Sequence, residues 1–280
     1  MIERGIVISP PFEVLPKGGI FCGGGIDSLE LRKHLLYFDK IDYPDNNIIS
    51  IGSSPDETYL ESTGILRRSR VNFTGTINSG NGEFFIAAQE AIYSKNSNIE
   101  PGQWSLGQSS INPHFSNGIT SQGIEFNLVN MLPVPQGIVP LEDILEFKQK
   151  RKDELIALRT HLDDVYQIII GSADIPRSMT TEIQKLETSL KEVNKTLSEA
   201  SISKIVTNLR SYIGGNFPST FGTALGGAGV SSLIGMSPLI AAVASAGLVL
   251  TIKPILSPRN SGVINPYNYL RSMRHHLGSK

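Results

Sequence analysis

Short apolar blocks alternate with amphipathic segments over residues 1–135. The apolar run Gly5–Ser9 ends at two prolines, which predicts a buried strand. Leu31, Leu35 and Phe38 then share one helical face, and Asp27 stands where an N-cap is expected. The same patterns predict helices over 56–66 and 83–94, strands over 48–51 and 124–129, and an extended segment over 71–77. Strands that alternate with helices predict a small α/β domain over 1–135.

Two runs of leucine and isoleucine follow, with apolar residues spaced three and four apart. This spacing predicts long helices over 141–170 and 179–199 and a third over 202–213. We expect the first two to form a coiled-coil-like hairpin, which either packs on the α/β domain or joins several copies of the chain. The expected seam of a homo-oligomer consists of Leu155, Leu158, Leu162, Ile183, Leu186 and Leu190.

The pattern changes again after residue 213. The 42 residues between Arg210 and Lys253 carry no charge, which is unusual for a solvated surface. A spanning helix needs about 20 apolar residues, so this run predicts a Gly/Ala-rich helical hairpin over 214–257 that enters a membrane. The residues expected to contact lipid or neighbouring helices are Gly222, Gly226, Leu239, Ala242, Ala246 and Leu250. The basic remainder, 258–280, is expected to be an exposed, flexible tail.

Together these patterns predict an α+β protein of several modules. They are the α/β domain over 1–135, a helical assembly region over 136–213, the membrane hairpin and the basic tail. The 280-residue chain is 40% hydrophobic, which excludes a wholly disordered chain. A net charge of -1 gives no signal for duplex nucleic acid. A single cysteine excludes an intrachain disulfide framework and a multi-cysteine zinc site.

Most of the candidate chemistry lies in the α/β domain. A glycine-rich loop over 17–25 includes Lys17, Gly23 and Gly24, and its backbone N–H groups could face a phosphate. A basic cluster, Arg67, Arg68 and Arg70, could meet the same ligand. These six residues predict a site for a nucleotide or oligonucleotide. The alternatives are a flexible surface loop and a solvated helix end, because the glycines fit neither dinucleotide nor Walker spacing.

No catalytic constellation can be assembled from the sequence. Cys22 lies in the glycine loop near a helix start, where its pKa could fall, but His34 is two turns into the helix. Paired histidines at His275 and His276 fit an exposed tail better than a metal clip. We therefore expect neither enzyme activity nor a metal or cofactor.

Two resemblances bear on function. The signature Leu35-Leu36-Tyr37-Phe38-Asp39-Lys40-Ile41 resembles the N-terminal segment of some uncharacterised bacterial families, which implies an accessory or defence role. The pattern of the apolar run is similar to the hydrophobic hairpin of pore-forming colicins. These resemblances and the uncharged run predict a pore-forming oligomeric effector whose N-terminal domain senses a trigger. Its expected location is the inner membrane with a cytoplasmic N-terminal domain, or the cytoplasm with conditional insertion. The alternative is a soluble oligomeric scaffold or binding protein with a buried Gly/Ala-rich core.

Overall fold

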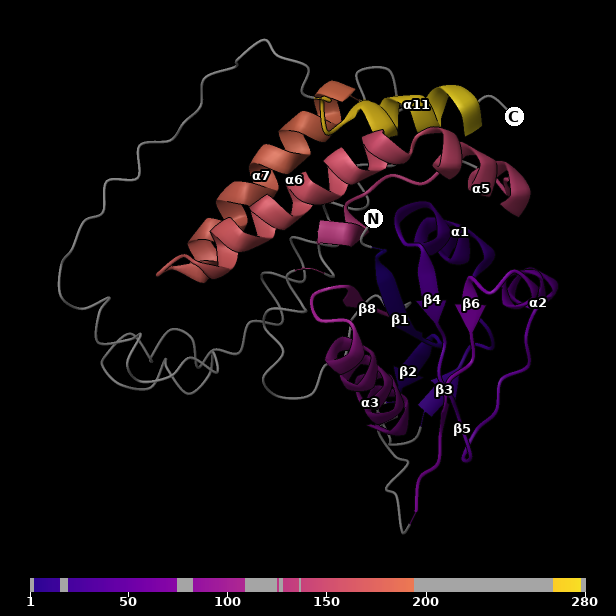
Figure 1. Cartoon of the computed structure of the whole chain (residues 1–280). Coiled ribbons are helices and arrows are strands. Elements are labelled where there is room, and N and C mark those ends of the chain that lie inside the picture. The colour runs from indigo at the N-terminus through magenta and orange to yellow at the C-terminus, as the bar shows by residue number, and fades with distance from the viewer. Residues whose placement is uncertain are drawn as a thin grey trace.

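The structure is a computed structural model that describes residues 3–15, 20–74, 83–108, 125, 128–135, 137–193 and 264–277. Over these residues the protein is a mixed α/β fold with a small parallel sheet, as the sequence predicts at this level. In Figure 1 the sheet and its helices form the lower body, and the helices of the second half lie above it.

The main sheet has four parallel strands, β1 (Gly5–Ser9), β4 (Lys40–Asp42), β6 (Leu66–Arg67) and β8 (Trp104–Gln108). Their order is β6-β4-β1-β8. The chain therefore passes from β1 through β4 to β6 at one edge of the sheet, and β8 then pairs with the other side of β1. Two short pairs stand beside this sheet. The strands β2 (Phe12–Val14) and β3 (Ile20–Cys22) are antiparallel, and β5 (Asp45–Asn46) and β7 (Arg70–Val71) are parallel.

Helices α1 (Ser28–Tyr37), α2 (Pro55–Ser62) and α3 (Glu83–Ile99) connect the parallel strands. Successive side chains of a strand face opposite sides of a sheet. Accordingly Ile6 and Ile8 of β1 join the core that contains Leu31 of α1, whereas Val7 joins Ile92 of α3 in a separate cluster. The sheet is therefore covered on both faces, as parallel sheets usually are.

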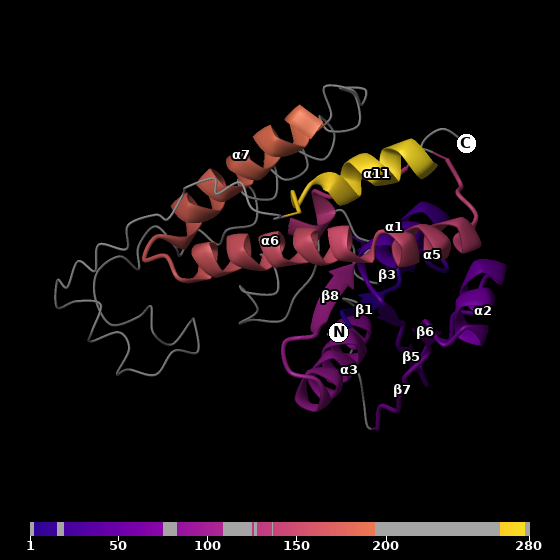
Figure 2. The same cartoon turned by 45° about the horizontal axis from the view of Figure 1, so that its top comes forward.

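The second half consists of α5 (Leu141–Lys150), α6 (Lys152–Ile170), α7 (Ile175–Val193) and α11 (Asn268–Leu277). Helices α6 and α7 form the expected hairpin, and α11 packs against α5 and α6 (Figure 2). Every described element beyond residue 140 is a helix, as predicted. One hydrophobic cluster runs from the sheet through α1 into these four helices, across the expected boundary near 135.

Several predicted elements differ from the structure. The predicted strand over 48–51 is wrong, because Asn46 Oδ1 accepts the N–H groups of Ile48 and Ile49 at 2.9 and 2.8 Å and withdraws them from strand pairing. The predicted strand over 124–129 is also wrong. Residues 125 and 128–130 are helical, and Leu128 and Leu132 are both buried at a helical spacing.

The predicted helix over 141–170 is divided in two at Arg151. No apolar residue stands between Phe147 and Leu155, so no core contact keeps the backbone helical at the break. The predicted tail is also partly ordered. Helix α11 lies within it and buries one face, formed by Tyr269, Leu270, Met273 and Leu277. The third central helix, 202–213, lies outside the described residues.

The expected oligomer seam is buried within one chain. Leu155, Leu158, Ile183, Leu186 and Leu190 all belong to the intramolecular core, and Leu162 packs against it. The helical spacing is thus explained without a second copy, and self-assembly stays a prediction.

No helix among the described residues is long and apolar enough to cross a membrane. This finding contradicts the expectation of a membrane-spanning, pore-forming protein and of an ion channel. The segment 214–257 that carried that expectation lies outside the described residues, together with Gly222, Gly226, Leu239, Ala242, Ala246 and Leu250.

Candidate functional site

A cavity of about 330 Å³ lies between the amino-terminal edge of the sheet and α6. A volume above roughly 300 Å³ is in the range of small-molecule sites. Its apolar and aromatic wall includes Tyr93, Trp104, Leu128, Val129, Leu162 and Tyr166. Its polar wall includes Arg4, Ser105, Glu125, Arg159 and Asp163. The cavity is thus lined by apolar and aromatic side chains together with a few polar groups, which is the usual composition of a ligand site.

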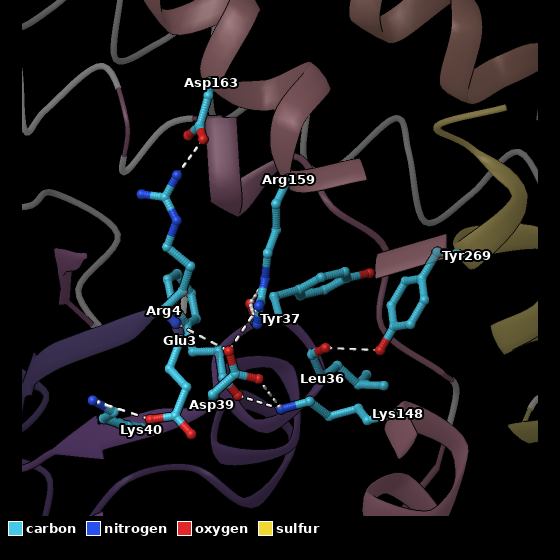
Figure 3. Close-up of polar contacts among 11 residues, drawn as sticks. Glu3, Arg4, Leu36, Tyr37, Asp39, Lys40, Lys148, Arg159, Asp163 and Tyr269 are labelled. Carbon is cyan, nitrogen blue, oxygen red and sulfur yellow. Dashed lines mark hydrogen bonds and ion pairs between the residues drawn. The ribbon is translucent and has the colours of Figure 1, made fainter. Parts of the chain in front are cut away.

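One side of the cavity is held by an ionic network around Asp39, which precedes β4 (Figure 3). Arg159 of α6 donates to Asp39 Oδ2 at 2.7 Å, and the backbone N–H of Arg4 donates to the same oxygen at 3.0 Å. Lys148 of α5 lies 3.5 Å from Asp39 Oδ1. The residue before β1 and the consecutive helices α5 and α6 therefore meet at one carboxylate.

Burial alone would raise the pKa of Asp39. The hydrogen bond from Arg159 and the positive charges of Lys148 and Arg159 outweigh burial and lower the pKa to about 2. Burial also lowers the pKa of Lys148 to about 8, against the opposing influence of Asp39. Asp39 is consequently a carboxylate at neutral pH and anchors the helical layer to the sheet.

The arginine side chains of the cavity are already bound to protein acceptors. Arg4 donates from Nη1 to the carbonyl oxygen of Gly102 at 2.7 Å and from Nη2 to Asp163. Arg159 donates from Nη2 to the carbonyl oxygen of Tyr37 at 2.8 Å, in addition to its bond with Asp39. Each guanidinium group thus helps to shape the wall, and its positive charge is paired with a carboxylate, that of Arg4 with Asp163 and that of Arg159 with Asp39.

Glu125 differs from the other charged groups because its hydrogen-bond donor, Ser105, is a neutral hydroxyl. Burial raises the pKa of Glu125, and the Ser105 hydrogen bond and the charge of Arg4 only partly offset this. Burial raises the pKa of Asp163 as well, although Arg4 opposes it. A carboxyl group with a raised pKa in a cavity is a typical feature of functional sites.

The structure places the predicted ligand residues at the opposite, carboxyl-terminal edge of the sheet. Gly23 and Gly24 are exposed in the loop before α1, and Lys17 lies outside the described residues. Arg67 donates from Nε to the buried carboxylate of Asp42 at 2.6 Å and from Nη2 to Asn96 Oδ1 at 2.6 Å. This network accounts for the position of Arg67 without a ligand.

The other two arginines also have protein partners. Arg68 donates from Nη2 to the carbonyl oxygen of Ile51 at 2.9 Å, and its guanidinium carbon is 4.1 Å from the centroid of the Tyr43 ring. Arg70 Nη1 lies 3.9 Å from Asp45 Oδ2. Glu57 lies near both Gly25 of the loop and Arg68, so the structure brings the loop and Arg68 together. Arg70 is exposed.

Sequence reasoning missed the cavity residues. Trp104 and Leu106 alternate with Ser105 and Gly107, a period of two that could have identified β8. Nothing in the local sequence connects Asp39 with Arg159, because the contact joins residues 120 positions apart. Within the described ranges, no three His, Cys, Asp or Glu side chains converge as metal ligands.

Comparison with known proteins identifies the family. The family model described as "Family of unknown function (DUF6236)" matches residues 15–278, and the chain therefore belongs to this family. No curated protein and no solved structure matches the chain.

Proposed function

We propose that this protein is a small-molecule binding protein and that its ligand occupies the cavity between the sheet and α6. The single observation that supports this most is the cavity itself, with aromatic walls and the partly buried carboxyl group of Glu125. The proposal develops the binding-protein alternative from the sequence and replaces the pore-forming assignment.

The residues that line the cavity indicate which kind of ligand it would bind. The positive charges of Arg4 and Arg159 are paired with Asp163 and Asp39, whereas the carboxyl groups of Glu125 and Asp163 supply acceptors. The rings of Tyr93 and Tyr166 favour a flat apolar group, and the faces of aromatic rings attract cations. The expected ligand is a small aromatic or aliphatic molecule with an amine or another hydrogen-bond donor.

Thermal unfolding with two matched probes tests the proposal. Benzylamine carries a cationic donor and benzoate an anionic acceptor on similar rings. We expect benzylamine to raise the melting temperature of the wild type and benzoate to have no effect. Glu125→Gln should abolish the benzylamine shift, while Asp164→Asn, which changes an exposed acid of α6, should retain it. No shift in the wild type, or an equal shift in Glu125→Gln, would contradict the proposal.

Two expectations from the sequence stay predictions within this proposal. Self-association through α6 and α7 rests on helix spacing, and sedimentation of the full chain tests it. A bacterial accessory or defence role rests on the resemblance of residues 35–41.

A further inference from the structure

Unpartnered polar atoms gather at the carboxyl-terminal edge of the sheet, on the side opposite the cavity. Buried side-chain atoms without a hydrogen-bond partner include Ser9 Oγ, Tyr43 Oη, Asp45 Oδ1, Glu57 Oε1 and Arg68 Nε. Ser9 ends β1, Tyr43 follows β4, Asp45 begins β5, Arg68 follows β6, and Glu57 lies in the first turn of α2. We refer to these five side chains as the carboxyl-edge cluster. Buried polar atoms in folded proteins rarely lack a partner, so a hydrogen-bond partner from outside the chain is expected here.

Three members of the cluster are in close contact. Arg68 stacks on the ring of Tyr43, and its Nη1 lies 3.7 Å from Glu57 Oε2. The backbone N–H of Ser54 donates to the same Glu57 oxygen at 3.1 Å, as part of a capping box. Tyr43 and Glu57 are both 0% exposed. One carboxylate oxygen of Glu57 is therefore fixed by the protein, while Oε1 and the Tyr43 hydroxyl have hydrogen-bonding capacity left over.

The backbone of the glycine loop lies beside this cluster at Gly25. A Cβ on Gly25 would lie 3.4 Å from Glu57 Oε1, so the loop backbone passes directly over that oxygen. Gly23, Gly24 and Gly25 are all exposed, and Gly24 has a φ of 101° that favours glycine. A small displacement of this exposed loop would give a ligand access to Glu57 and Tyr43.

The local charges argue against a phosphate. Helix N-termini are the usual phosphate sites of α/β proteins, but the chain itself caps those of α1 and α2, which adjoin this cluster. Asp27 Oδ1 accepts the N–H groups of Leu29 and Glu30 at 2.9 and 3.2 Å at the start of α1. Ser54 and Glu57 cap α2 in the same way. The unpartnered carboxylate oxygens of Asp45 and Glu57 would repel an anion as well.

The cluster offers both donors and acceptors, which hydroxyl groups match because they also donate and accept. Its place in the sheet is also compatible with a ligand, because ligands of open parallel sheets bind outside the carboxyl ends of the strands. The cluster lies mainly at the ends of β4 and β6, and its member Ser9 ends β1, beside the reversal of strand order between β1 and β8. We propose that this edge is a second site, separate from the cavity, for a neutral ligand with adjacent hydroxyl groups such as a ribose ring without phosphate.

Calorimetric titration of the full chain with D-ribose, adenosine, AMP and inorganic phosphate tests this site. Ribose or adenosine is expected to bind to the wild type, AMP at least tenfold more weakly than adenosine, and phosphate not at all. Binding of ribose and adenosine alike identifies a sugar site, and binding of adenosine alone identifies a nucleoside site. Either supports the proposal. No binding of either compound, or binding of AMP or phosphate as tight as that of adenosine, overturns it.

A matched pair of variants separates binding from folding. Tyr43→Phe removes the unpartnered hydroxyl and keeps the ring beneath Arg68, so the melting temperature without ligand should stay the same or rise. Affinity for the compound that binds should fall at least tenfold. Tyr269→Phe removes a hydroxyl that donates to the Leu36 carbonyl oxygen at 2.8 Å, so it should lower the melting temperature and leave the affinity unchanged. Wild-type affinity in Tyr43→Phe would overturn the proposal.

Discussion

Arg159 of α6 donates a hydrogen bond of 2.7 Å to Asp39, the residue directly before β4. This contact fastens the helical second half to the amino-terminal edge of the sheet (Figure 3). It also fixes one wall of the cavity, because Arg159 lines that space. The ion pair is therefore structural and determines the shape of the proposed binding site.

Asp39→Ala is expected to lower the free energy of unfolding by about 2–3 kcal/mol, because Arg159 and Lys148 would keep buried charges without their carboxylate partner. The pKa of Asp39 is about 2 when folded, below its ordinary value of 3.8. Its stabilisation is therefore complete above about pH 4 and disappears as the pH falls through 2. Urea denaturation at several pH values measures both effects. Asp164→Ala is the control, and an equal loss in the two variants would refute this role of Asp39.

His34 makes the protein sensitive to mild acid. The ring is 3% exposed, both ring nitrogens lack a hydrogen-bond partner, and burial lowers its pKa from 6.5 to about 3. Glu30 Oε1 lies 3.9 Å from His34 Nε2, at the limit of an ion pair. The effect of burial is larger, so the folded protein keeps the ring neutral. The unfolded chain binds a proton below pH 6.5 that the folded chain excludes, so stability falls as the pH drops from 6.5 toward 3.

His34→Leu removes that proton uptake and should flatten this part of the stability curve by up to about 1 kcal/mol per pH unit. It also removes two unpartnered polar atoms, so stability at pH 7 should not decrease. Denaturation curves from pH 4 to 7 for the wild type and the variant provide the comparison. An unchanged slope in the variant would show that His34 is protonated in the folded protein.

Gly5 gives space to the chain's single tryptophan. A Cβ at Gly5 would lie 2.5 Å from Trp104 Cε3, closer than side-chain contacts allow. Gly5→Ala should therefore displace the indole, shift its fluorescence and cost about 1–3 kcal/mol of stability. Gly52→Ala meets no atom within 4 Å and is the matched control. Wild-type fluorescence and stability in Gly5→Ala would mean that β1 and β8 are not packed as described.

A substitution of Leu158 tests whether the apolar seam between α6 and α7 is formed within one chain. The residue is 0% exposed in the intramolecular core, so Leu158→Asp should abolish folding, at a cost of about 4 kcal/mol or more. Ile168 of the same helix is 53% exposed, and Ile168→Asp should leave the fold intact. Circular dichroism with light scattering distinguishes the outcomes. A folded, dissociated Leu158→Asp protein would instead place this residue between copies of the chain.

The sequence was informative where local patterns decide structure. The buried strand at Gly5–Ser9, the Asp27 cap and the α6–α7 hairpin all follow from periodicity and capping chemistry. It was less informative where a side chain redirects the backbone, as Asn46 does for residues 48 and 49. The cavity was not predictable, because it depends on contacts such as Arg4 with Asp163, which join the residue before the first strand to a distant helix.

Patterns of charge did not reveal two features of the structure. Asp42 and Glu57 form ion pairs with Arg67 and Arg68, and the sequence did not predict these partners. The segment 258–280 was expected to be an exposed tail, and its charged residues are all basic. Its four buried residues, Tyr269, Leu270, Met273 and Leu277, are spaced for one helical face and dock on α5 and α6.

Fluorescence of Trp104 during titration with benzylamine tests the proposed cavity most directly, because this tryptophan lines the cavity. Val129→Phe should fill the space with the ring of a larger lining residue, while Ile168→Phe adds the same ring at an exposed position of α6. We expect saturable quenching in the wild type and in Ile168→Phe, and none in Val129→Phe. No saturable quenching in the wild type, or the same quenching in all three proteins, would contradict binding in this cavity.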